Sequence, residues 1–293
     1  MINLQTEQMR IKQLLRQDKQ TEQSNEQYYQ QALSYIREHL MVFYERYAAN
    51  NQLSVAETAQ RISKWDLAQW KKALNELQYK DWPDGALDNL ESIAGSAGRN
   101  VRHMMDGIIA LGVLSMFVKQ YQLATSQVEQ QGMIEVNRAG IKNVKDLVNI
   151  VTDPENATTW SSNLWSDSDD FTRDLQSVID KKIRHGASMD DLVNVLVPHS
   201  KELEKPNTNA ADRLAVAKRN GQRLILSETA RVKDRVNMAT FRQMDVKWVR
   251  WVCEPGACDR CLALEEGGPY PIDACPDIPD DSHPNCHCGK VPA

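Results

Sequence analysis

Apolar residues recur every three or four positions along most of this chain, which predicts a mainly helical protein. The segments with this spacing are 28–49, 87–119, 121–151, 171–185 and 210–244. No strand-like alternation longer than a few residues precedes Val246. The expected fold class is therefore mainly α. Elongated helical N-terminal and middle regions should precede a small α+β or irregular C-terminal module rich in Cys and His.

Polar residues at several positions mark where helices begin and end. Ser54 opens a capping box with Glu57 three positions later, so a short helix should follow it. Asp66 is the expected cap of the next helix. Gly186 should end the helix over 171–185, and Ser188 should begin another.

Two segments leave their local structure open. Residues 1–27 are rich in Gln, Glu, Lys and Arg, which indicates a polar helix or a frayed arm exposed to solvent. The pattern over 87–119 contains four glycines, which weaken it as a helix. Those glycines indicate either close contact between helices or a break into two helices.

Composition divides the chain into three regions. Residues 152–170 are rich in Ser, Thr, Asn and Asp, and residues 205–209 read Lys-Pro-Asn-Thr-Asn, so both segments are expected to be linkers. The predicted regions are 1–151, an N-terminal helical region; 152–209, a linker and helical hairpin; and 210–293, a C-terminal domain with a basic helix and a Cys/His tail.

The sequence predicts no membrane anchor. A membrane helix needs about 20 apolar residues, and the best run, from Ile108 to Val118, is interrupted by Gly112 and Ser115. The first residues lack the basic and then apolar order of a signal peptide. We therefore expect the protein to be made in a cytoplasm.

Charge is distributed unevenly, although the formal net charge of the whole chain is only −5. Residues 205–250 hold eleven basic and four acidic residues, whereas residues 251–293 hold two basic and eight acidic residues. Either the basic helix pairs its charges with the acidic tail and with other subunits, or its basic face contacts the DNA backbone without sequence preference. Arg231, Lys233 and Arg235 are the candidate DNA contacts.

All six cysteines lie in the last 41 residues, and this clustering favours metal ligation over a disulfide framework. Cys258-x-x-Cys261 and His283-x-x-Cys286 form two pairs with the spacing of a tetrahedral Zn²⁺ site. Cys288 could replace either member of the second pair. Cys253 and Cys275 are expected to be small buried side chains or spare thiols. The alternative is that no metal binds.

The tail gives little indication of catalysis. Cys258 and Cys261 lack the βαβ context of a thiol oxidoreductase, and no His-x-Glu motif of a zinc deaminase precedes them. A metal-dependent nuclease could use His283 or His287 with Asp280 and Asp281, but the sequence shows neither an open coordination position nor a general base. The expectation is that the chain is not an enzyme.

These motifs, in this order, resemble the C-terminal domain of the phage head-morphogenesis family, also called the minor head proteins or the Mu protein F-like family. The matching stretches are Leu226–Arg231, Lys247–Trp251, Cys258–Cys261 and His283–Cys288. Looser matches lie upstream, over 43–57 and 165–186. His287 departs from the pattern, which usually has Arg between the last two cysteines. Ser227 also departs, at a position where the family has an Arg or Thr.

The resemblance implies a role in the virion of a tailed bacteriophage. Such a protein would be present in few copies, near the portal or inside the capsid, after assembly in the host cytoplasm. Its partners would be the portal protein and the major capsid or scaffold protein, with packaged double-stranded DNA as a further candidate. It would act in head morphogenesis, or alternatively as a DNA-binding protein ejected with the genome.

Overall fold

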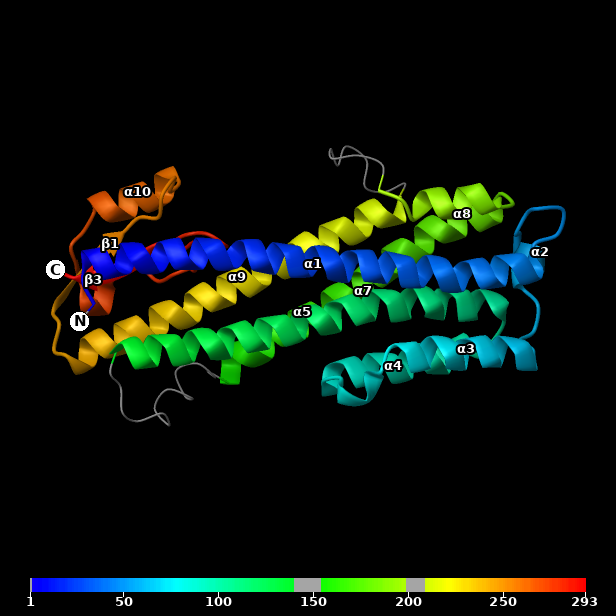
Figure 1. Cartoon of the computed structure of the whole chain (residues 1–293), viewed down its shortest axis with the longest axis horizontal. Coiled ribbons are helices and arrows are strands. Elements are labelled where there is room, and N and C mark those ends of the chain that lie inside the picture. The colour runs from blue at the N-terminus through cyan, green and yellow to red at the C-terminus, as the bar shows by residue number, and fades with distance from the viewer. Residues whose placement is uncertain (1, 140–153, 199–208) are drawn as a thin grey trace. The chain divides into compact units, whose positions relative to one another are not determined.

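The computed structural model describes residues 2–139, 154–198 and 209–293, and these are mainly helical with one small sheet near the C-terminus (Figure 1). The helices are α1 (Leu4–Tyr47), α2 (Val55–Thr58), α3 (Lys64–Glu76), α4 (Asp84–Ala97), α5 (Val101–Ala139), α7 (Pro154–Arg184), α8 (Met189–Val195), α9 (Ala210–Gln243) and α10 (Asp259–Glu266). Short 3-10 turns are η1 (Tyr79–Asp81) and η3 (Ile272–Ala274). The strands are β1 (Trp248–Val252), β2 (Tyr270–Pro271) and β3 (Gly289–Pro292). The expected fold class is confirmed.

The chain forms two compact units that do not follow the sequential boundaries at 151 and 209. Unit 1 contains residues 1–24, 121–160 and 221–293, and unit 2 contains residues 25–120 and 161–220. The helices α1, α5 and α9 each contribute residues to both units. The sequence could not reveal this division. The spacing of apolar residues in a long helix is the same on both sides of the point where the helix passes from one unit to the other.

Helix α1 begins at Leu4, so residues 4–27 are neither a frayed arm nor a solvated lead-in. Glu7 and Arg10 are buried despite their charge. Arg10 Nε donates to Glu135 Oε1 of α5 at 2.7 Å, and Lys233 Nζ of α9 lies 2.9 Å from Glu7 Oε1. Partners that are more than 120 residues away in sequence make this burial possible.

The caps are largely those that the sequence predicts. Ser54 and Glu57 form a complete capping box at α2, and Ser188 caps α8. Helix α3 differs, because Ser63 is its N-cap and Asp66 completes the capping box from the third helical position. Asp66 is therefore not the N-cap, but it accepts a hydrogen bond from the backbone N–H of Ser63 at 2.6 Å.

Both interpretations of the glycines over 87–119 hold at different positions. Helix α4 ends at Ala97, and α5 begins at Val101 after the break at Gly98. Gly107 and Gly112 lie inside α5 and face bulky side chains. A Cβ atom at Gly107 would lie 2.9 Å from the Trp70 ring. Of the first pair, Gly95 lies in the last turn of α4 and Gly98 caps its end, whereas the second pair permits close packing.

The expectation of a linker over 152–170 is wrong where the structure describes it. Helix α7 begins at Pro154 and continues without interruption to Arg184. Proline is well tolerated in the first turn of a helix, which explains why Pro154 starts this one. The expected helical residues 140–151, the boundary at Asp153 and the linker residues 205–208 lie outside the described residues.

The apolar segment of α5 is buried inside the structure. Within the described residues, Val101–Arg138 is the one helix long and apolar enough to cross a membrane by length and composition. In the structure, 83% of its apolar window is buried. Residues such as Ile108, Leu111 and Phe117 have at most 1% of their surface exposed, as in the core helix of a helical protein.

Candidate metal centre

The C-terminal module is a three-stranded antiparallel sheet with the order β2-β1-β3, joined by loops that carry the cysteines. Its strands lie beside the N-terminal part of α1 in Figure 1. Val249 and Val291 of the sheet pack with Ile11 of α1 and Phe241 of α9 in one apolar cluster. The sheet is therefore attached to two long helices rather than standing alone.

One residue of β1 packs directly against the thiols. Trp251 is fully buried and packs with Cys261, Cys286 and Cys288. Lys290 Nζ lies 5.7 Å from the centroid of the Trp251 ring, within the range of a cation–π interaction. This apolar wall excludes water from the thiols on that side.

The structure brings together all five residues that the sequence singles out as metal ligands. Their ligand atoms form two overlapping groups, each with all atoms within 4.8 Å of one another: Cys258, Cys261 and His283, and Cys261, Cys286 and Cys288. The Sγ atoms of Cys261 and Cys286 are 3.7 Å apart. Two thiolates on one tetrahedral Zn²⁺, each bonded at about 2.3 Å, would be about 3.8 Å apart. These groups could hold a metal ion.

The hydrogen bonding of His283 leaves one of its nitrogen atoms available to a metal. Its Nδ1 lies 2.8 Å from the carbonyl oxygen of Pro284, which assigns the proton to Nδ1. Its Nε2 is buried and has no hydrogen-bond partner. A buried nitrogen lone pair without a donor is costly, and coordination to a cation would satisfy it.

The surroundings of most of these thiols disfavour the thiolate form. A hydrogen bond with Cys288, followed by burial, raises the pKa of the Cys286 thiol, and burial likewise raises the pKa of Cys261. Burial raises the pKa of Cys253 to about 11. The exposed Cys258 differs, because hydrogen bonds from backbone N–H groups, first that of Cys261, lower its pKa. A divalent cation would stabilise the thiolate forms together, so the donor set fits a metal.

Glu254 is a neighbour of the cluster that the sequence did not indicate. Its carboxylate forms a third group within 4.8 Å with His283 and Cys286. Its Oε1 also accepts a hydrogen bond from the backbone N–H of His287 at 3.2 Å. Glu254 occurs in a Glu-Pro-Gly turn with no recognisable ligand spacing, so no sequence signal could have identified it.

Cys253 and Cys275 do not belong to any of the three groups found among the described residues. Cys253 donates to the carbonyl oxygen of Cys261 at 3.1 Å, and Cys275 packs against the apolar cluster around Val249. Both thiols are partly buried. Cys253 lies beside the candidate ligands, and both residues lie where small apolar side chains would.

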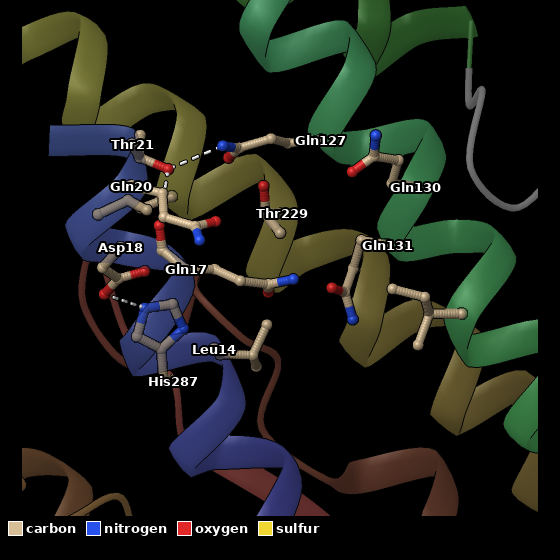
Figure 2. Close-up of a pocket in the computed structure, with 12 residues that line it drawn as sticks. Leu14, Gln17, Asp18, Gln20, Thr21, Gln127, Gln130, Gln131, Thr229 and His287 are labelled. Atoms are coloured by element: carbon tan, nitrogen blue, oxygen red, sulfur yellow. Dashed lines mark hydrogen bonds and ion pairs between the residues drawn. The ribbon is translucent and has the colours of Figure 1, made fainter. Parts of the chain in front are cut away.

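His287 points away from the cluster and toward α1. Its Nε2 lies 2.7 Å from Asp18 Oδ2, and its Nδ1 is buried without a partner. Figure 2 shows this pair at the edge of a pocket whose walls carry mainly amide and hydroxyl groups, including those of Gln17, Gln131 and Thr229. The nuclease alternative placed His283 or His287 with Asp280 and Asp281, but neither aspartate belongs to any metal group found in the described chain.

Lys233 does not fit the predicted DNA contact. Its side chain is 2% exposed and pairs with Glu7, so it cannot reach a phosphate. Arg231 forms ion pairs with Glu228 and with Asp280 of the acidic tail. Burial raises the pKa of Glu228, and the charges of Arg231 and Arg235 offset part of that rise. Near the tail, basic residues of α9 thus interact with acidic groups of the same chain.

Comparison with known proteins identifies no relative of this chain. No protein-family model, no curated protein and no solved structure matches the chain. The functional interpretation therefore rests on the motifs and on the geometry of the cluster.

Proposed function

We propose that this chain is a minor head protein of a tailed bacteriophage whose C-terminal module is held by one structural Zn²⁺. The proposal combines the resemblance over 226–288 with one observation. Cys258, Cys261 and His283 form one candidate group, and Cys286 joins Cys261 and His283 in two groups that overlap it. These four residues are the motif positions that carry the resemblance. The protein would act in head morphogenesis through contacts with the portal protein and the capsid or scaffold protein.

The donor set favours a structural metal over a catalytic one. Sites with three Cys and one His are typically closed, because all four tetrahedral positions are taken by protein ligands. Catalytic zinc needs a position for water or substrate. In this chain, Cys286 and Cys288 are buried, and Trp251 covers the thiols. When bound, the metal would cross-link the loop after β1 to the segment before β3.

Contact with DNA does not form part of this proposal. Lys233 is buried, and Arg231 already pairs with two carboxylates of its own chain. A non-sequence-specific DNA-binding surface needs several basic groups free to meet phosphates. No observation on the described residues favours that alternative.

The metal is tested by native mass spectrometry of the full chain. We expect one Zn²⁺ per chain at neutral pH, lost when Cys258 and Cys261 are both replaced by Ser. Cys275→Ser is the matched control, because this thiol lies outside the metal groups found among the described residues. A wild-type chain that is folded and free of metal in zinc-containing buffer would refute the structural zinc.

The role in the virion requires a separate experiment. Quantitative mass spectrometry of purified particles and of procapsids from the source phage should find the chain at low copy number, together with the portal protein. Deletion of its gene should reduce infectious particles much more than it reduces head formation. Absence of the chain from both particles, or unchanged infectivity, would contradict the proposed function.

A further inference from the structure

The segment that carries the last two cysteines contacts the metal cluster and helix α1 in alternation. Cys286 and Cys288 belong to the thiol group with Cys261. Between them, His287 reaches Asp18 of α1 at 2.7 Å. Next in sequence, Gly289 lies so close to α1 that a Cβ atom there would be 2.7 Å from Glu7 Cδ. Residues 286–289 therefore contact two parts of the chain that are far apart in sequence, the thiol group and helix α1.

The contact with α1 is reinforced by a buried ion pair. Lys233 Nζ donates to the carbonyl oxygen of Cys288 at 3.2 Å and lies 2.9 Å from Glu7 Oε1. Glu7 is fully buried. Burial alone would raise the pKa of Glu7, but Lys233 and Arg138 outweigh it and hold the pKa below its ordinary value. Glu7 is thus a charged residue of α1 that is linked to the backbone of Cys288 through Lys233.

The N-terminal part of α1, residues 4–21, is held by such contacts in addition to the apolar packing of Ile11. Its sequence is mostly polar, and a polar helix gains little from packing unless its buried charges are paired. Asp18 and Glu7 receive partners from the segment 287–289 and from Lys233. Displacement of that segment would remove His287 from Asp18 and the Cys288 carbonyl oxygen from Lys233.

We propose that Asp18 and Glu7 are positioning residues of the metal centre, and that metal binding is coupled to docking of residues 4–21 of α1. This inference rests on the proposed metal. A bound metal would fix Cys286 and Cys288, which directs His287 toward Asp18 (Figure 2). Coupling between two binding equilibria is reciprocal. If bound metal increases the equilibrium constant for docking of α1 by some factor, docking of α1 must increase the metal affinity by the same factor.

The Gly- and Pro-rich sequence between the ligand pairs explains why the coupling should be measurable. Residues 267–282 contain two glycines and four prolines, and a metal would tie this loop to the sheet. Groups that support metal ligands from outside the coordination sphere typically change metal affinity by about 10- to 100-fold when removed. His287 lies between two candidate ligands, so the interaction with Asp18 acts directly on their backbone.

Hydrogen exchange of the full chain tests the coupling. We expect amides of residues 8–21 to exchange at least about tenfold faster after zinc is removed by a chelator. Amides of residues 30–45, in the part of α1 that belongs to unit 2, should exchange at an unchanged rate. Bound zinc without any difference in residues 8–21 would overturn the coupling and leave the metal site intact.

Two alanine variants test the reciprocal effect. Asp18→Ala should weaken zinc binding about tenfold while the stoichiometry stays at one. Glu22→Ala, an exposed acidic position one turn further along α1, should leave the affinity unchanged. Equal zinc affinities for both variants and the wild type would overturn the positioning role of Asp18. Absence of zinc from the wild-type chain would instead overturn the proposed metal, and the coupling with it.

Discussion

Gly112 of α5 lies directly against Ile36 of α1, so that a Cβ atom at Gly112 would fall 2.8 Å from Ile36 Cδ1. Ile36 is fully buried and cannot move into solvent to make room. The two helices therefore approach each other at a distance that only glycine permits. This contact is in the core of unit 2.

We expect Gly112→Ala to lower the free energy of unfolding by about 1–3 kcal/mol, because overpacking forces the Ile36 side chain or the backbone to shift. Gly95→Ala is the matched control. Gly95 lies in helix α4, and no atom comes within 4 Å of a Cβ placed there. This control should raise stability by about 0.5–1 kcal/mol, since alanine favours the helix. Denaturant unfolding measures both values, and equal effects would contradict the close packing.

A second prediction concerns pH. Burial, followed by the charge of Asp180, raises the pKa of Asp106 to about 7, although Arg102 pairs with both carboxylates. The pKa of Asp106 in the unfolded chain is near 4, so the folded state binds the proton more tightly. This group therefore favours folding at pH 4 and loses that contribution as pH rises toward 7 and above.

Asp106→Asn removes the ionisable group at nearly constant shape. We expect the variant to be more stable than the wild type at pH 8, by about 3–4 kcal/mol, and to differ little at pH 4. Thermal unfolding at the two pH values measures the difference. The exposed Asp88→Asn serves as the control and should show no such dependence. An equal effect of Asp106→Asn at both pH values would contradict the raised pKa.

A third prediction concerns the ion pair between Glu7 and Lys233. Removal of one partner leaves a buried charge uncompensated, which typically costs about 3–5 kcal/mol. We expect Glu7→Gln and Lys233→Gln each to destabilise the chain, and the double variant to be more stable than the sum of the single effects implies. A double-mutant cycle measures this coupling, expected at about 1–3 kcal/mol. A coupling near zero would show that the two charges do not depend on each other.

The final prediction distinguishes the ligands. Cys286 belongs to two of the three candidate groups, whereas Cys288 belongs to one. We therefore expect Cys286→Ser to abolish zinc binding and Cys288→Ser to weaken it. Competition with a chromophoric chelator measures both affinities. The reverse order would assign Cys288, and not Cys286, as the fourth ligand.

Much of the helical structure was predictable because it is local. The 3.6-residue spacing of apolar positions identified α9, and the capping residues Ser54 and Ser188 located the starts of two shorter helices. The Cys/His pairs were also visible, since two short spacings place four ligands within reach of one metal. Each of these features depends on residues only a few positions apart, or on one motif.

The tertiary structure alone decided which polar residues are buried. Glu7, Arg10 and Lys233 occur in segments with the composition of solvated surface, and nothing near them in sequence provides their partners. Lys233 becomes an internal charge instead of a DNA contact because α1 brings Glu7 beside it. Asp18 meets His287, which lies between two candidate ligands, for the same reason, although 269 residues separate them in sequence. The free energy of a buried charge depends on its neighbours in space, and the linear sequence does not specify those neighbours.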